Sequence, residues 1–282
     1  MISNYRRFVY ILIKSSWYNG EMASDHNSNE QKTYFELLAE IGHTKHIGGM
    51  AATNRLLGLI DPQAGDAVLD VGCGVGIGPL FLAEHFSCHV LGVDITPRMI
   101  DRARERALRH GVSDSVRFCV SDMHDLPFEE NSFDSAVAES VLTFSKDKTV
   151  VLAELARVVR PGGMVAFTEA IWVRVPPHNK RDFMARASGM PEGILSHEEW
   201  EAVIAKSALE DVVAEAYAIT ARDEAKSQYG RIQPADYLRT LPGFFRVIRQ
   251  SRFRKVFRTA AGSMPKDYYD YIGYGVYGGV VR

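Results

Sequence analysis

The stretch Val68–Gly78, VLDVGCGVGIG, decides how the rest of this 282-residue chain is interpreted. Apolar residues lead into glycines at every second position, and an apolar helical pattern follows over Pro79–Ala83. A strand, a glycine turn and a helix in this order make up the first unit of a doubly wound nucleotide-binding sheet. The glycines allow a sharp turn and let a ligand approach the backbone N–H groups closely. The start of the helix adds a partial positive charge.

The spacing of these glycines excludes the dinucleotide fingerprint Gly-x-Gly-x-x-Gly, because both possible frames place another residue at the third position. What fits is Asp70-x-Gly72-x-Gly74-x-Gly76. An acid at the strand end would repel a pyrophosphate. A ligand that carries both an ammonium and a carboxylate suits this turn, and Cys73 lies inside it.

The stretch resembles motif I of the class I S-adenosylmethionine (SAM)-dependent methyltransferases. The resemblance extends over roughly residues 45–170 and is closest to the small-molecule branch of quinone, sterol, tocopherol and glycine methyltransferases. It implies SAM as cofactor, with Cys73 among the residues that line it. It also implies an α/β fold with a doubly wound, Rossmann-like sheet of seven mostly parallel strands, the last strand antiparallel.

Asp94 follows the second predicted strand, twenty residues after Gly74. An acid at this place can accept hydrogen bonds from both ribose hydroxyls of a nucleotide. Capping of the predicted helix 97–110 is the alternative, and both roles can hold together. Ile95 lies beside Asp94 and is expected to line the same site. On the helix that follows, the arginines, Arg102 and Arg106 among them, are expected to face solvent.

Asp122 and Met123 follow the third predicted strand, Val116–Val120. Ligands of open α/β sheets bind at such carboxyl ends. The resemblance implies that the Asp122 carboxylate meets the adenine amino group and that the Met123 amide meets a ring nitrogen.

His46 and Glu139 are the candidate catalytic residues. Glu139 ends the fourth predicted strand, where it would orient the methyl acceptor, act as a base or contact the cofactor; an exposed loop acid is the alternative. His46 lies in an element that, in the resembled family, folds over the cofactor; a capping or surface histidine is the alternative. A base is needed only if the acceptor holds its proton at working pH.

Composition and cysteine spacing bear on which ligands and partners the chain can have and on where it is located. The net charge of −2 argues against a nucleic-acid partner. Three scattered cysteines lack the spacing of metal ligands or of a disulfide framework, so we expect no metal and a reducing, cytoplasmic location. The apolar run near the N-terminus is too short for a signal peptide or membrane span. An alternative interpretation of residues 1–21 is an extension that results from a misassigned start codon.

The sequence predicts five segments. A flexible extension (1–30) precedes N-terminal helices over the cofactor site (31–60), a SAM-binding core (61–220), a basic helical insertion (221–267) and a closing strand (268–282).

Residues 221–260 hold ten Lys or Arg and three Asp or Glu, a net charge of +7 in a chain whose net charge is −2. Three interpretations stay open: an amphipathic helix pair with a solvated basic face, a lid over an anionic acceptor, and docking on an anionic partner such as a membrane, a protein or RNA. The candidate lid residues are Arg246, Arg249, Phe253 and Arg254.

The predicted function is methyl transfer from SAM to a small-molecule acceptor by in-line displacement. Two alternatives remain: a catalytically inert module that binds SAM or a partner, and a nicotinamide-dependent oxidoreductase, which the broken fingerprint disfavours.

Overall fold

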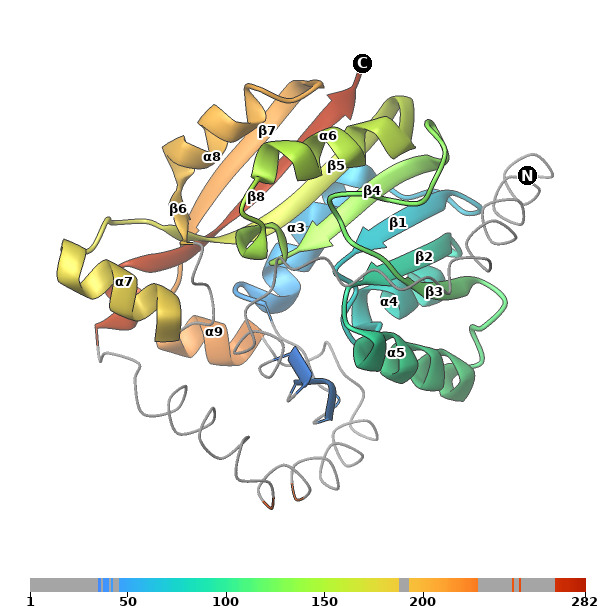
Figure 1. The fold of residues 1–282 in the computed structure, drawn as a ribbon, viewed down its shortest axis with the longest axis horizontal. Coiled ribbons are helices and arrows are strands. Elements are labelled where there is room, and N and C mark those ends of the chain that lie inside the picture. Colours follow the sequence, from blue (N-terminus) through green and yellow to red (C-terminus); the bar gives the residue numbers. More distant parts are fainter. Residues whose placement is uncertain are drawn as a thin grey trace.

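An eight-stranded sheet, ordered β3-β2-β1-β4-β5-β8-β7 with β6 beside β5, carries the fold (Figure 1). The computed structural model describes residues 35–36, 38–40, 42, 46–187, 193–227, 245, 249 and 267–282. The strands are β1 (Ala67–Val71), β2 (His89–Asp94), β3 (Val116–Val120), β4 (Phe133–Glu139), β5 (Val159–Trp172), β6 (Leu195–Ser196), β7 (Leu209–Ala218) and β8 (Ile272–Val281).

Helices lie on both faces of the sheet. They are α3 (Gly49–Ile60), α4 (Ile77–Phe86), α5 (Pro97–His110), α6 (Lys148–Val158), α7 (His178–Ala187), α8 (His197–Ile204) and α9 (Ala221–Ser227), with short 3-10 turns at Leu142–Phe144 and Tyr268–Asp270. One apolar core joins the sheet to α6 and α8, and a second joins it to α3, α4 and α5. Because both faces are covered, β1 is buried along its whole length.

The direction of the strands confirms the predicted topology. Strands β1 to β6 pair in parallel, whereas β8 is antiparallel to both β5 and β7. The expected closing strand therefore lies beside β5 as the one strand of reversed direction in the described sheet. The predicted count of seven was one too low, because Leu195–Ser196 adds a short strand next to the extended end of β5.

β5 is longer than its pairing with β4, because it continues past Thr168 to Trp172, where β8 pairs with it. Residues 160–163 lie outside the pairing with β4, which passes from Val159 to Met164, and Gly162 has a φ of +75°. A capping box formed by Ser196 and Glu199 begins α8.

Candidate active site

The glycine loop between β1 and α4 has the backbone conformation that its sequence predicts. Gly72, Gly74 and Gly76 have φ values of +73°, +52° and +82°, which favour glycine. A Cβ at Gly72 would lie 2.4 Å from a methyl of Val141, in the loop after β4. The glycine loop is thus closely packed on the side of β4.

The amides of this loop are used inside the protein, which corrects the expectation that they face a ligand. Gly72 and Cys73 both donate to the carbonyl of Val93, and Gly76 donates to the carbonyl of Cys73. The amide of Gly74 donates to Asp94 Oδ2 (3.0 Å). These bonds hold the loop against β2, so a ligand would meet mainly bare glycine surface.

Asp94 orients the turn after β2 as well as the glycine loop. Its Oδ1 accepts from the amide of Thr96 (2.8 Å), while Oδ2 holds Gly74. Thr96, not Asp94, is the N-cap of α5, so the capping alternative was wrong. Burial raises the pKa of Asp94, and the two amide bonds oppose that rise. Ile95 lies in the same turn, half-buried.

Asp122 forms a chain of side-chain contacts that the sequence did not predict. Its Oδ1 lies 2.6 Å from Nδ1 of His124 and also accepts from the His124 amide. Nε2 of His124 lies 2.7 Å from Oγ of Ser145, a buried residue in the loop after β4. Met123 is half-buried and packs against the core on the α6 side.

Asp70 and Glu139 come from neighbouring strands and approach the same point at the start of α4. A Cβ at Gly78 would lie 2.7 Å from Oδ2 of Asp70 and 3.4 Å from Oε1 of Glu139. The absence of a side chain at Gly78 keeps room for both carboxyl groups. Two carboxyl groups in one place provide an electrostatic environment for a cation.

His46 and Glu139 meet although 93 positions separate them in the sequence. Nε2 of His46 lies 2.6 Å from Oε2 of Glu139. The hydroxyl of Thr53 in α3 donates to the same oxygen (2.7 Å) and lies 3.2 Å from the His46 ring. The His46 side chain is 4% exposed, so the alternative of a surface histidine was wrong. Glu139 is half-buried and bonded, which excludes the solvated loop acid.

Glu169 is a buried acid of β5, one residue past the part of the strand that pairs with β4, and no sequence motif marked it as a site residue. Its Oε1 accepts from the amides of Val141 (3.0 Å) and Leu142 (2.7 Å), whereas Oε2 is buried with no hydrogen-bond partner in the described structure. Burial raises the pKa of Glu169 to about 8, although these amides and Lys148 oppose the rise. Glu169 thereby anchors the loop that packs against Gly72.

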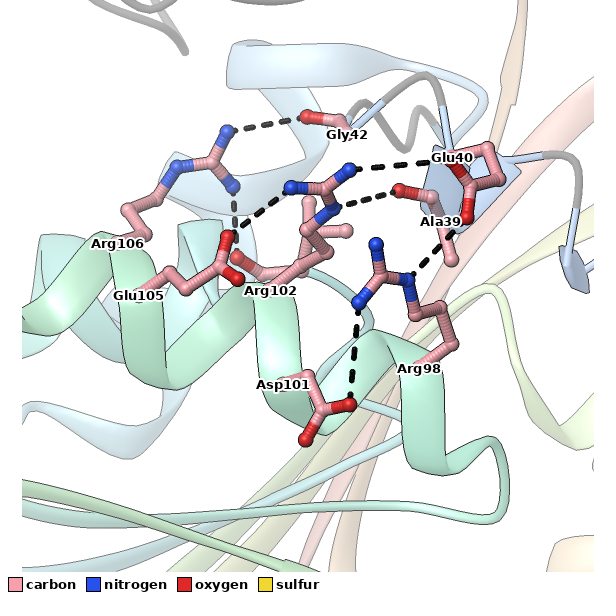
Figure 2. A network of polar contacts seen from close by, with 9 residues as sticks. Ala39, Glu40, Gly42, Arg98, Asp101, Arg102, Glu105 and Arg106 are labelled. Atoms are coloured by element: carbon pink, nitrogen blue, oxygen red, sulfur yellow. Dashed lines mark hydrogen bonds and ion pairs between the residues drawn. The ribbon is translucent and has the colours of Figure 1, made fainter. Parts of the chain in front are cut away.

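Two arginines of α5, Arg102 and Arg106, bind the N-terminal segment, as Figure 2 shows, whereas Arg104 and Arg109 are exposed as expected. Arg106 is buried and donates to the carbonyls of Val75 (2.6 Å) and Gly42 (3.1 Å). One turn earlier, Arg102 donates to the carbonyl of Ala39 (3.2 Å). Their positions one turn apart on α5 were read from the sequence as a solvated face, which was wrong for these two residues.

The carboxyl ends of β1 to β4 thus bring together Asp70, Asp94, Asp122 and Glu139, on strands adjacent in the order β3-β2-β1-β4. Of the lid residues, Arg249 is described and exposed, whereas Arg246, Phe253 and Arg254 lie outside the described residues. Cys73 is buried, which raises the pKa of its thiol.

Among the described residues, no group of three or more His, Cys, Asp or Glu side chains could hold a metal ion. None of the described helices has the length and apolar character needed to cross a membrane.

Comparison with known proteins gives consistent matches. A family model described as "Methyltransferase domain" matches residues 69–167. Phosphoethanolamine N-methyltransferase 1 of Triticum aestivum is 32% identical over 168 residues, 60% of this chain and 33% of that protein. The 27-O-demethylrifamycin SV methyltransferase of Amycolatopsis mediterranei is 33% identical over 166 residues, 58% of this chain and 61% of that protein.

A solved structure agrees at the level of the fold. Haemonchus contortus phosphoethanolamine N-methyltransferase 2, in complex with phosphomonomethylethanolamine and S-adenosylhomocysteine, superposes with a TM-score of 0.68 at 21% identity. The match covers 89% of this chain and 57% of that one. The aligned part spans a third to three fifths of the length of the two curated relatives, so the comparison concerns their methyltransferase core.

Proposed function

Because this chain belongs, through residues 69–167, to the class I SAM-dependent methyltransferases, we propose that it transfers the methyl group of SAM to a small-molecule acceptor and releases S-adenosylhomocysteine. The observation that carries the proposal is the convergence of four acids at the carboxyl ends of β1 to β4, around a turn with three left-handed glycines.

The residues present suit SAM. Gly78 lacks the side chain that would fill the space beside Asp70 and Glu139, and these two carboxyl groups favour a ligand that carries positive charge. Asp94 would bind the ribose hydroxyls, with Ile95 beside it. Asp122 and the Met123 amide would hold the adenine. Gly72, Cys73, Gly74 and Gly76 would form the floor of the site.

When bound, SAM supplies a methyl group that the positive charge on sulfur activates for displacement. The protein must then hold the acceptor in line and exclude water. We propose that the segment 31–60 covers the cofactor, since Phe35, Leu38 and Ala39 pack in one apolar cluster with Val75 of the glycine loop and Met99 of α5, and Gly42 accepts from Arg106. No metal is required for these steps.

His46 and Glu139 are the proposed acceptor-side pair. Glu139 would take up the proton of the acceptor at its carboxylate, and His46 and Thr53 would stabilise that carboxylate through Oε2. A base of this kind serves an acceptor that is protonated before transfer, such as a hydroxyl or an ammonium.

The proposed acceptor is a small molecule with an anionic group, held by the basic segment 221–260. Phosphoethanolamine, named for the wheat relative, has this character, and the rifamycin relative points to hydroxyl groups of larger apolar molecules as a second class to test. The three described cysteines are free, which suits the proposed cytoplasmic location.

The experiment combines SAM binding by calorimetry with transfer of a labelled methyl group to both acceptor classes. Glu139→Gln and His46→Ala should lower kcat about a hundredfold or more, as loss of a general base does, with SAM affinity changed far less. Thr53→Val removes one of the two groups bound to Glu139 Oε2 and keeps the shape of the side chain, so it should lower kcat less than Glu139→Gln does. SAM binding without transfer to any acceptor would favour the inert module, and failure to bind SAM would overturn the proposal.

A further inference from the structure

The side chains of Asp122, His124 and Ser145 form a continuous chain of contacts that joins the loops after β3 and β4. Nδ1 of His124 donates to Asp122 at 2.6 Å, and the hydroxyl of Ser145 lies 2.7 Å from Nε2 on the other side of the ring. With its proton on Nδ1, a neutral imidazole donates to the aspartate and accepts from the serine. One histidine therefore connects the loops that follow β3 and β4, two strands that β2 and β1 separate in the sheet.

On the first side, His124 fixes the plane of the Asp122 carboxylate. The ring nitrogen and the backbone amide of His124 both bond to the same oxygen, Oδ1. The backbone bond closes a local turn that any residue at position 124 can form. The ring bond depends on the histidine itself, so the orientation of Asp122 can be changed without breaking the turn.

On the second side, Ser145 is part of a loop that touches several parts of the proposed site. Val141 of this loop packs against Gly72, and its amide and that of Leu142 are held by Glu169. Phe144 makes an edge contact with Phe35 of the N-terminal segment, with ring centroids 5.0 Å apart. The Ser145 side chain is 1% exposed, which leaves it no role as a nucleophile toward a bound substrate.

We propose that His124 is a positioning residue that couples the adenine end of the cofactor site to the loop 140–147, so that cofactor binding orders the acceptor edge. This inference rests on the proposed function, since it takes Asp122 as an adenine contact. Asp122 is the residue that would contact the ligand. His124 would then hold Ser145, and with it the loop 140–147, in one position. Neither Asp122 nor Ser145 needs to touch the acceptor.

Two substitutions separate the two sides of the histidine. His124→Asn places an amide nitrogen close to the position of Nδ1, so it keeps the bond to Asp122 and loses the bond to Ser145. His124→Gln places its amide close to the position of Nε2, so it keeps the Ser145 side and loses the bond to Asp122. Ser145→Ala removes the contact between Ser145 Oγ and His124 Nε2 while His124 is kept, so it is the mildest of the three variants.

The readouts are S-adenosylhomocysteine affinity by calorimetry and hydrogen exchange of residues 141–147 with and without that ligand. In the unaltered chain, ligand should slow exchange in this loop about tenfold. His124→Gln should weaken binding about tenfold, the usual effect of losing a charged hydrogen bond. His124→Asn and Ser145→Ala should bind within about twofold of the unaltered chain but lose the ligand-dependent protection. Exchange in β7, far from both loops, reports whether each variant is folded.

Protection of the loop that persists in both His124→Asn and Ser145→Ala would overturn the coupling. Unchanged binding in His124→Gln would overturn the positioning of Asp122. A lack of S-adenosylhomocysteine binding by the unaltered chain would instead count against the proposed function, so the two failures are distinguishable.

Discussion

Some side chains in this protein form hydrogen bonds to two different loops at once, and Asp94 is the clearest case. Its two oxygens hold the glycine loop through Gly74 and the start of α5 through Thr96. A ribose contact would add to these bonds, because each carboxylate oxygen can accept more than one. Binding and loop geometry therefore depend on the same carboxylate.

We expect Asp94→Ala to weaken SAM binding by roughly 1–3 kcal/mol, the cost of losing a charged hydrogen-bond partner. Asp94→Asn is the control, since its amide oxygen keeps one acceptor and should retain part of the affinity. Calorimetry on both variants measures the difference. Equal affinities for Asp94→Ala and the unaltered chain would exclude the ribose role.

Glu169 provides a prediction for the dependence of stability on pH. Its pKa is raised by burial to about 8, so the folded state holds the proton more tightly than the unfolded state does. Its stabilising contribution is therefore complete below the ordinary glutamate range near 4.5 and is lost as the pH rises through about 8. Glu169→Gln cannot titrate and keeps an acceptor oxygen for Val141 and Leu142.

The measurement is urea unfolding at pH 6 and pH 9 for both proteins. The free energy of unfolding of the unaltered chain, measured relative to that of Glu169→Gln, should be smaller at pH 9 than at pH 6. The other titrating groups are common to both proteins and cancel in this comparison. If the difference is the same at both pH values, Glu169 does not hold a proton in the folded state near neutrality.

At the scale of elements, α5 is a support for the N-terminal segment. Arg106 connects Val75 of the glycine loop to Gly42, and an apolar cluster of Ala39, Val75, Ile77 and Met99 lies beside these bonds. A buried arginine must satisfy its donors, and here backbone carbonyls do so. The segment and the glycine loop are thus linked through one side chain.

Arg106→Met should lower the free energy of unfolding by about 1–3 kcal/mol, because it leaves two carbonyl groups without their donor. Arg102→Met is the matched control one turn earlier: its side chain is 25% exposed and water can replace it, so the loss should be smaller. Denaturant unfolding of both variants tests this order. A larger loss for Arg102→Met would contradict it.

At the scale of the whole molecule, charge is unevenly distributed. Residues 221–260 carry +7 and the remainder of the chain therefore −9. In the described part of that segment, Glu224 is buried and accepts from the amide of Gly48, two residues after His46. This contact places the beginning of the basic segment beside the proposed acceptor-side pair.

We therefore expect reversal of Arg246, Arg249 and Arg254 to Glu to raise KM for an anionic acceptor at least about tenfold, while SAM affinity is retained. Steady-state kinetics and calorimetry on the same preparation measure the two effects. An unchanged KM, with a change only in solubility or in binding to anionic vesicles, would favour the solvated face or the membrane interpretation over the lid.

The sequence by itself determined the parts of this protein that depend on neighbours along the chain. The glycine turn, the order of strands and helices, and the acids at the strand ends follow from local patterns, since a strand end and a left-handed glycine are set within a few residues. The family and the topology of the sheet were predictable for this reason.

Only the tertiary structure decided which distant groups meet. His46 reaches Glu139 because α3, which begins three residues after His46, packs against β5, β8 and β4, and His124 reaches Ser145 because the loops after β3 and β4 meet at the same edge of the sheet. Arg106 was predicted to face solvent but is buried. Helical periodicity identifies a polar face of a helix but cannot show whether another segment covers it. Burial and pairing depend on packing between elements remote in sequence, and they determine the charge and position of the side chains at this site.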